Sequence, residues 1–265
     1  MDIASLTSCP KRFQKDNCVG LMRVLCSLLE QNLPFDKVIL NLNEDEYELL
    51  HKSNFQLRDE RLDIHIVEKS FGNIRSFKKF IPTVKWYVEN CEKNDNDRIY
   101  IFDDDWVVNK YYHDYFNTII SNPNYDTQNQ VIGMRYNPMT KYVGRLDATQ
   151  MPAAASSYPL KHFDKDFYEN FNQELAEKFN FEDELYYCLY AKKKNLGGIV
   201  TNASFTQFMK ELENNETTLA CKYCGNFVNG NPCNPRTNEI YQVVYDTFGI
   251  IPPNYLLPYC IYDNT

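Results

Sequence analysis

The first half of the chain alternates between segments with strand-like and helix-like patterns. Short apolar or alternating runs at residues 2–6, 38–42 and 62–67 predict strands. Between the first two runs, apolar residues recur at helical spacing, at Leu21, Val24, Leu25, Leu28 and Leu29. Strands separated by helices favour a mainly parallel sheet with helices on both faces. We therefore predict an α/β fold.

Three consecutive aspartates, Asp103, Asp104 and Asp105, follow the apolar run at residues 99–102. A short apolar run bounded by polar residues predicts a buried strand, so the triplet is expected at its carboxyl end. Ligands bind beyond the carboxyl ends of the strands in open α/β sheets. In an extended chain, Asp103 and Asp105 would point to one side and Asp104 to the other.

Carboxylates this close to one another repel. Two of them about 5 Å apart repel by about 3 kcal/mol at an effective dielectric constant near 20. Water, protonation or a bound cation must offset this repulsion. Oxygen ligands suit Mg²⁺ or Mn²⁺, and Mg²⁺ commonly uses one or two carboxylates plus substrate phosphates. A solvated acidic loop is the alternative, but the apolar strand before the triplet and Trp106 after it favour a metal and phosphate site.

Composition limits the classes of function. The formal net charge of -8 supplies no broad basic field, which argues against a general nucleic-acid binder. The sequence contains no run of about 18 apolar residues, so we predict no transmembrane helix. The amino terminus lacks an apolar run of signal-peptide length, and the chain has nine cysteines, an odd number. We therefore expect reduced thiols and a cytoplasmic location.

The second half of the chain is less regular. Residues 131–136 predict another strand. Residues 183–194 predict a helix that is acidic at its start and basic at its end, as the helix dipole favours. Gly197 and Gly198 are expected to end this helix.

The sequence shows neither an internal repeat nor a clear linker. From residue 202 onward it is polar and rich in Cys, Asn and Pro, which predicts loops draped over the domain. We therefore predict one domain over residues 1–265, with an α/β core over about 1–200 and a loop-rich C-terminal extension over about 201–265.

Residues 4–13, ASLTSCPKRF, with the Leu-rich helix and the strand at 38–42 after them, resemble the opening of small GT-A glycosyltransferases. Residues 71–82 and 99–106 are similar to that family's approach to its DXD motif. The resemblance covers about residues 3–200, and only the aspartate motif in its strand context is specific. It implies a GT-A, Rossmann-like fold. It also implies transfer of a sugar from a nucleotide-sugar donor, with a UDP-sugar favoured, to a glycan or other hydroxyl acceptor.

The resemblance also implies roles for the aspartates. In that family the motif holds a divalent cation, Mn²⁺ or Mg²⁺, and the ribose-diphosphate of the donor. Asp103 and Asp105 match the outer metal-binding pair, and Asp104 fills the middle position on the donor side. His162 is the candidate for a downstream histidine ligand of the metal.

The first strand–helix turn faces the donor in this fold. Thr7, Ser8 and Arg12 are therefore candidates for contacts with the nucleotide. The alternative is ordinary turn chemistry, because Thr and Ser favour turns and helix caps.

A family lysine follows a Gly-Pro pair, whereas this chain has Gly72 and Asn73 and about three extra residues before Lys79. Arg75 is therefore an equal candidate with Lys79 for binding the donor phosphates.

An inverting transferase needs a general base that takes the proton of the acceptor hydroxyl. The family carries an acidic dipeptide that opens a helix, and here Glu182 and Asp183 match it. Asp183 is the first candidate, with Glu182 and Glu184 behind it. Acidic residues in a first helical turn also stabilise a helix by about 0.3–1 kcal/mol without any chemistry. A retaining enzyme needs no such base, and the sequence leaves the stereochemistry open.

Two other functions compete with this interpretation. A haloacid-dehalogenase-type phosphatase also pairs aspartates two residues apart at a strand end, but there the motif normally ends the first strand. About 100 residues precede the triplet in this chain. A catalytically inactive nucleotide-sugar-binding module is the non-enzymatic alternative.

A zinc site is a weaker hypothesis. Cys221 and Cys224 form one tight pair, and Cys233 and Cys260 stand alone, whereas structural zinc usually takes four ligands in two tight pairs.

Overall fold

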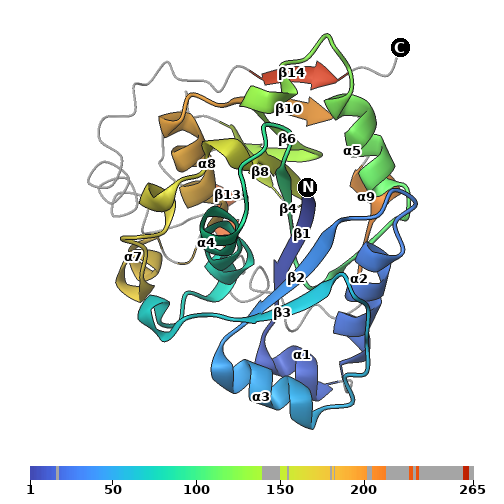
Figure 1. Cartoon of the computed structure of the whole chain (residues 1–265), viewed down its shortest axis with the longest axis vertical. Coiled ribbons are helices and arrows are strands. Elements are labelled where there is room, and N and C mark those ends of the chain that lie inside the picture. Colours follow the sequence, from blue (N-terminus) through green and yellow to red (C-terminus); the bar gives the residue numbers. More distant parts are fainter. Residues whose placement is uncertain are drawn as a thin grey trace.

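The computed structural model describes residues 1–15, 18–138, 150–153, 155–179, 181, 183–201, 205–212, 227–228, 231–232 and 259–262. Its centre is an eight-stranded sheet with the strand order β14-β10-β6-β9-β4-β1-β2-β3 (Figure 1). The strands are β1 Asp2–Thr7, β2 Lys37–Leu42, β3 Leu62–Ile66, β4 Arg98–Phe102, β6 Gln130–Gly133, β9 Ser156–Pro159, β10 Gly197–Thr201 and β14 Tyr259–Tyr262.

Seven of the eight strands of this sheet run in the same direction. β1 pairs in parallel with β2 and β4, β2 pairs with β3, and β10 pairs with β6 and β14. β9 runs antiparallel to both of its neighbours, β4 and β6. The predicted α/β class with a mostly parallel sheet is confirmed.

Helices connect the strands. They are α1 Pro10–Lys15, α2 Val19–Leu29, α3 Glu44–Lys52, α4 Ile81–Asn90, α5 Tyr112–Ile120, α7 Gln173–Lys178, α8 Asp183–Lys193 and α9 Phe205–Phe208. Short 3-10 turns occur at η1 Lys69–Phe71, η2 Arg75–Lys79, η3 Thr127–Asn129, η4 Leu160–His162 and η5 Lys165–Phe167.

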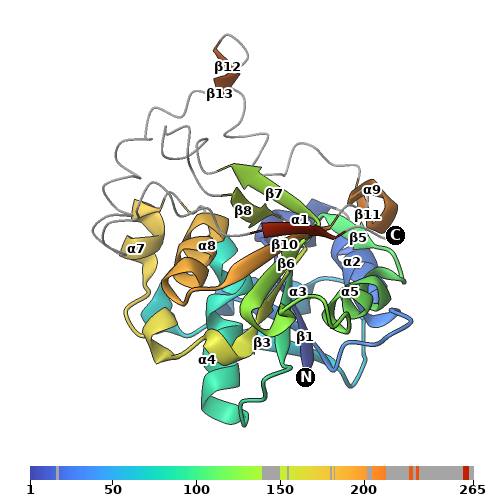
Figure 2. The same ribbon diagram turned by 90° about the horizontal axis from the view of Figure 1, so that it is seen from above.

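Each face of the sheet has its own hydrophobic core, because side chains alternate along each strand. Ala4 lies beside Val38 and Tyr100 and packs with α2 and α5; we call this the α2 core. The neighbouring Ile3 faces the other way with Ile99 and packs with α4 and α8, in what we call the α4 core. Figure 2 shows α2 and α5 on one side of the sheet and α4 and α8 on the other. The prediction of helices on both faces is confirmed.

The α4 core is built from aromatic rings around Phe80, the N-cap residue of α4. Its ring centroid lies 4.5–5.1 Å from those of four other rings, which belong to Tyr158, Phe163, Phe167 and Tyr187. Tilted and edge-on aromatic pairs add about 0.5–1.5 kcal/mol each beyond their buried area. These contacts fix η2 and the start of α8 on this face of the sheet.

Within the described part of the chain, three small two-stranded sheets accompany the main one. β5 Trp106–Val108 pairs with β11 Met209–Glu211, β7 Arg135–Pro138 with β8 Gln150–Ala153, and β12 Phe227–Val228 with β13 Asn231–Pro232.

Three sequence expectations need correction. The strand expected at 131–136 is two strands, β6 and β7, which belong to different sheets. Gly197 and Gly198 begin β10 rather than only ending a helix. The segment after residue 201 is not only loops, since β14 extends the main sheet and β11 pairs with β5.

None of the described helices combines the length and the apolar character that a membrane span requires.

Candidate functional site

Several of the predicted site residues meet at the carboxyl ends of β1 and β4. The register pairs Leu6 of β1 with Phe102 of β4, so the segments that follow these two strands leave the sheet side by side. Ser8 and α1 follow β1, and the aspartate triplet follows β4. The five residues of β4 are all buried, as the apolar run predicts.

The triplet does not continue the strand. β4 ends at Phe102, and Asp104 and Asp105 form a turn before β5 begins at Trp106. The expected alternation, with Asp103 and Asp105 on one side, is therefore wrong. Asp104 and Asp105 face the first strand–helix turn together, while Asp103 faces η2.

Arg12 forms ion pairs with both Asp104 and Asp105. Its Nε lies 3.6 Å from Asp104 Oδ2, and a terminal guanidinium nitrogen lies 3.4 Å from Asp105 Oδ2. The Ser8 hydroxyl donates to Asp104 Oδ2 at 2.5 Å. Because the Arg12 side chain is almost fully buried, this arrangement fixes the turn after β1 against the turn after β4.

Lys79 connects Asp103 with the start of α8. Its ammonium donates to Asp103 Oδ1 at 2.7 Å and lies 2.9 Å from Asp183 Oδ2. The Lys79 side chain is 7% exposed, whereas that of Asp103 is 39% exposed. Asp103 is therefore the carboxylate of the triplet that solvent reaches most easily.

η2 and the turn before α8 are also linked directly. The Arg75 guanidinium lies 4.2 Å from the centroid of the Phe181 ring, and the Ser76 hydroxyl donates to Phe181 O at 2.8 Å. Arg75 and Phe181 both adopt left-handed backbone, with φ values of 46° and 59°. Such strain in non-glycine residues persists only where surrounding contacts hold it, and it is concentrated at functional sites.

Lys78 and Glu46 form a buried ion pair directly behind Lys79. Lys78 Nζ donates to Glu46 Oε2, and the two side chains are 2% and 9% exposed. The same Glu46 oxygen accepts from Asn43 N at 2.7 Å and closes the capping box of α3. Removing one partner of such a pair costs about 3–5 kcal/mol. The pair therefore holds η2 against the end of β2.

A buried polar network lies beneath the site, between β1, β2 and α4. The Asn41 amide donates to Thr83 Oγ1 at 2.9 Å and to Ser5 Oγ at 3.1 Å, and the two hydroxyls lie 2.8 Å apart. The Thr7 hydroxyl donates to Asn41 O at 2.7 Å. Thr7 therefore stabilises the strand ends in this structure, as the turn-chemistry alternative expects.

Burial governs the electrostatics of the cluster. Burial raises the pKa of Asp105 to about 7, with further increases from Asp103 and Asp104 and an opposing effect of Arg12. Burial also raises the pKa of Asp104, although Arg12 and the Ser8 hydroxyl oppose this. Burial alone would lower the pKa of Lys79, but Asp103, Asp183 and nearby Glu184 outweigh it and raise that pKa well above its usual value.

The cluster retains capacity for a cation. Its four carboxylates share only two cationic partners in these ion pairs, Arg12 and Lys79. The carboxylates belong to Asp103, Asp104, Asp105 and Asp183. The Asp105 Oδ1 atom is buried and accepts no hydrogen bond. Among the described residues, no three His, Cys, Asp or Glu side chains converge as a preformed ligand set. The donor set fits a cation that takes one or two carboxylates from the protein and further oxygens from a phosphate ligand.

His162 is not brought to this cluster. β9 runs antiparallel to β4. Its last residue, Pro159, therefore lies beside Arg98, at the amino end of β4 and away from the aspartate triplet at the other end of that strand. His162 follows there in η4, and its Nε2 lies 3.0 Å from Gln128 O. The expectation of a metal-ligating His162 is corrected on this ground.

Other sequence hypotheses lie outside the described residues. These are Glu182 as a second candidate base and the cysteines Cys221, Cys224 and Cys233 as zinc ligands. Cys260 lies in β14, next to β10. Sequence reasoning missed Glu46, Lys78, Asn41 and Thr83, whose roles depend on partners far away in the chain. The Asn43-to-Glu46 spacing before a helix is a capping-box signature that would have marked Glu46.

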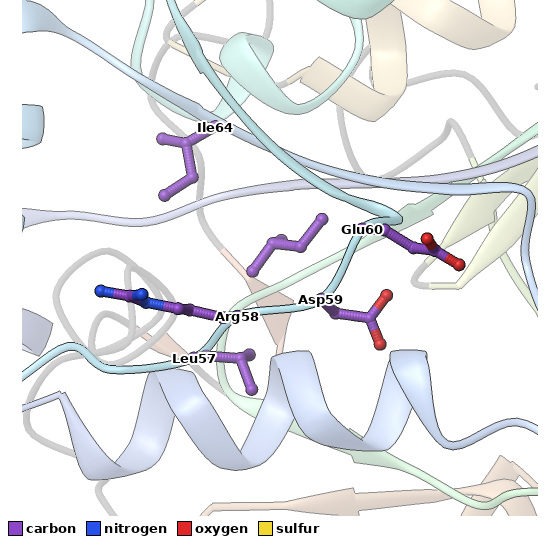
Figure 3. A pocket seen from close by; sticks show the side chains of 6 residues that line it. Leu57, Arg58, Asp59, Glu60 and Ile64 are labelled. Atoms are coloured by element: carbon purple, nitrogen blue, oxygen red, sulfur yellow. The ribbon is translucent and has the colours of Figure 1, made fainter.

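A separate pocket lies far from the cluster, at the beginning of β3 (Figure 3). Six residues line it, namely Leu57, Arg58, Asp59, Glu60, Leu62 and Ile64. It shares no residue with the carboxylate cluster.

No protein-family model and no curated protein sequence matches the chain. Solved structures with a similar arrangement include S. aureus TarS 1-349, with 12% identity, a TM-score of 0.46 and coverage of 92% of this chain and 72% of that one. The cytidylyltransferase IspD of Francisella tularensis has 12% identity, a TM-score of 0.43 and coverage of 76% and 89%. The galactosyltransferase LgtC, in complex with donor and acceptor sugar analogs, has 10% identity, a TM-score of 0.41 and coverage of 95% and 98%.

Proposed function

We propose that this chain is a metal-dependent glycosyltransferase of the GT-A type. It transfers a sugar from a nucleotide-sugar donor, with a UDP-sugar favoured, to a hydroxyl group of a glycan or another acceptor. The observation that carries the proposal is the convergence of the aspartate triplet, Lys79 and Asp183 at the carboxyl ends of β1 and β4.

Asp105 and Asp103 are the proposed ligands of Mn²⁺ or Mg²⁺. Asp105 supplies a buried oxygen without a hydrogen-bond partner, and Asp103 supplies the most exposed carboxylate of the triplet. When bound, the cation would supply Lewis-acid relief of the charge that develops on the departing diphosphate.

The proposed role of Arg12 and Ser8 is to orient the metal-binding turn. They do not contact the donor directly. Both engage Asp104, and Arg12 also engages Asp105, so the turn is held in one conformation before a ligand arrives. Ligands held by a preorganised turn lose less conformational entropy on binding.

Lys79 and Arg75 are the proposed cations for the donor phosphates. Both belong to η2, and the ion pair between Lys78 and Glu46 fixes this turn beside the site. Asp183 is the proposed general base, because its carboxylate lies beside the same ammonium as the exposed Asp103. A base in this position would take the acceptor proton as the sugar is transferred.

A thermal-shift panel tests the proposal. UDP, GDP, CMP and ADP are each added with Mn²⁺ and with EDTA. We expect one nucleotide, UDP first, to stabilise the protein only with Mn²⁺, by about 2.7 kcal/mol at 100 times its Kd. No response to any nucleotide would contradict the proposal, and hydrolysis of p-nitrophenyl phosphate with Mg²⁺ would then favour the phosphatase alternative.

The variant Asp105→Asn sharpens this test. We expect it to remove the Mn²⁺-dependent shift by UDP, because it replaces the buried carboxylate with a neutral amide. Asp95→Asn is the matched control, since the Asp95 side chain is 73% exposed and lies outside the cluster. Retention of the full shift in Asp105→Asn would exclude Asp105 as a ligand.

A further inference from the structure

β3 is the last strand at one end of the main sheet, and its outer edge has no partner among the described residues. The hydrogen bonds that flank it, from Val38 N to Arg61 O and from Val67 N to Leu42 O, show which groups face β2. Odd-numbered residues use their main-chain groups for β2. The N–H and C=O groups of Leu62, Ile64 and Ile66 therefore point away from the sheet, toward the open edge.

The sequence of this strand, LDIHI, is complementary to itself about Ile64. If two such strands pair antiparallel with Ile64 opposite Ile64, Leu62 faces Ile66 and Asp63 faces His65. Apolar residues then meet on one face, and an acidic residue meets an imidazole on the other. Cross-strand apolar pairs of this kind stabilise antiparallel strands.

The two faces of β3 differ in how well they are covered. Leu62 and Ile64 pack against the α2 core, but Ile66, on the same face, is 49% exposed. On the other face, Asp63 accepts from Lys37 at 2.5 Å, and the His65 ring lies 5.5 Å from that of Trp86. Ile66 is therefore the apolar side chain of this strand that the described structure leaves most exposed.

The pocket beside β3 has an apolar part that matches this side chain. Leu57, Leu62 and Ile64 line it, with Arg58 and Glu60 among its charged residues (Figure 3). In the pairing described above, Ile66 of a second copy lies opposite Leu62 on the same face of the extended sheet. That position is next to the pocket.

We propose that two copies of this chain associate through β3, antiparallel and centred on Ile64, so that Ile66 of each copy enters the pocket of the other. Edge strands present a ready template for such pairing. The occupant is a second copy because, in this register, every apolar residue of the strand lies opposite an apolar residue of an identical strand. A strand pair of this length buries less than the roughly 1,200–2,000 Å² that stable interfaces bury. We therefore expect a weak dimer that is populated only at high protein concentration.

Sedimentation velocity of the full chain over about 5–200 μM tests the association without any nucleotide. We expect the sedimentation coefficient to rise with concentration, and Ile66→Lys to weaken dimerisation at least tenfold, since an ammonium cannot replace the apolar contacts of Ile66 with Leu57, Leu62 and Ile64. Val19→Lys is the matched control, because Val19 is also 49% exposed and lies on α2. A monomer throughout the range, or a dimer that Ile66→Lys leaves unchanged, would overturn the proposal.

Cysteine cross-linking tests the register and does not depend on how Ile66→Lys folds. Residues in a hydrogen-bonded antiparallel pair have Cα atoms about 5.5 Å apart, within disulfide range. Under mild oxidation, Ile64→Cys should form a symmetric disulfide between two copies. Leu62→Cys should not, because two Leu62 positions would lie about 13 Å apart along the strands. Equal cross-linking at both positions, relative to wild type, would refute this register.

Discussion

The ammonium of Lys79 lies 2.9 Å from Asp183 Oδ2. The same nitrogen donates to Asp103 Oδ1 at 2.7 Å. One buried cation therefore holds two carboxylates from opposite ends of the site, the turn after β4 and the first turn of α8.

In the absence of metal and nucleotide, the variant Lys79→Met should be less stable than the wild-type protein. It leaves Asp103 and Asp183 without their shared ammonium, and breaking a buried ion pair costs about 3–5 kcal/mol. Urea unfolding of the two proteins measures this difference. Mn²⁺ should restore part of the loss, because it supplies positive charge to the same carboxylates.

The matched control is Lys69→Met. The Lys69 side chain pairs with Glu44 at 2.7 Å but is 84% exposed. Exposed pairs contribute little to stability, so this change should have little effect. Similar losses for both variants would show that the burial of Lys79 has no energetic role.

The variant Asp183→Asn should lower kcat for sugar transfer by about 10²–10⁴-fold, the range for a general base. The donor KM should change little, since Asp183 is not a proposed ligand of the donor. Initial-rate kinetics with a UDP-sugar separate the two effects. Glu174→Gln is the control, because Glu174 also lies in a first helical turn, that of α7, but is 75% exposed. An unchanged kcat in Asp183→Asn would restrict this carboxylate to its ion pair with Lys79.

The variant Thr83→Val should reduce the free energy of unfolding by about 1–3 kcal/mol. Valine keeps the shape of threonine but leaves the Ser5 hydroxyl and the Asn41 amide with one partner fewer in a buried place. Chemical denaturation measures the effect. Thr118→Val is the control, since the exposed Thr118 hydroxyl donates to Asp114 O of its own helix, at 3.0 Å. If Thr83→Val were as stable as wild type, the network would add nothing to the fold.

Acid should destabilise the contact between α8 and the chain after β9. Partial burial would raise the pKa of Asp164, but hydrogen bonds from Lys93 and Lys194 outweigh it and lower that pKa. The pKa of Asp166 is lowered likewise, with Tyr190 and Lys194 opposing the effect of burial. Carboxyl groups with lowered folded pKa values stabilise the protein above their unfolded pKa near 4. This stability is lost as the pH falls through the folded values.

The double variant Asp164→Asn with Asp166→Asn should flatten the pH dependence of unfolding below about pH 5. At pH 7 it should cost about 1 kcal/mol, as expected for partly exposed pairs. Thermal unfolding between pH 2 and 7 checks both statements. Asp95→Asn, which removes an exposed carboxylate 3.9 Å from Lys161, should leave the slope as in wild type.

The sequence predicted the elements whose pattern is local. The alternating and apolar runs predicted β1 to β4, and the spacing of leucines predicted α2. The sequence also predicted that the triplet and the turn after β1 follow strands of one parallel sheet, where ligands bind beyond the carboxyl ends. It did not predict that Ser8 and Arg12 contact the aspartates themselves.

What the sequence did not predict depends on long-range geometry. Strand alternation failed for Asp105, because β4 ends at Phe102 and a turn follows. His162 was misplaced because the reversed direction of β9 leaves no trace in local composition. The ion pair of Glu46 with Lys78 joins residues 32 positions apart, and nothing in either segment specifies the other.

The pairing of β5 with β11 has a consequence for the order in which a nascent chain can fold. Trp106, the residue after the triplet, pairs with Glu211, so this edge of the site is completed late in synthesis. At about 5–20 residues per second, a ribosome needs roughly 5–20 s to extend the chain from one of these residues to the other. During that interval, β1 to β4 can already pair, and Lys79 can neutralise Asp103 before α8 arrives with Asp183. Lys79 and Asp103 are both synthesised before Asp183, so this ion pair can form before the second carboxylate is present.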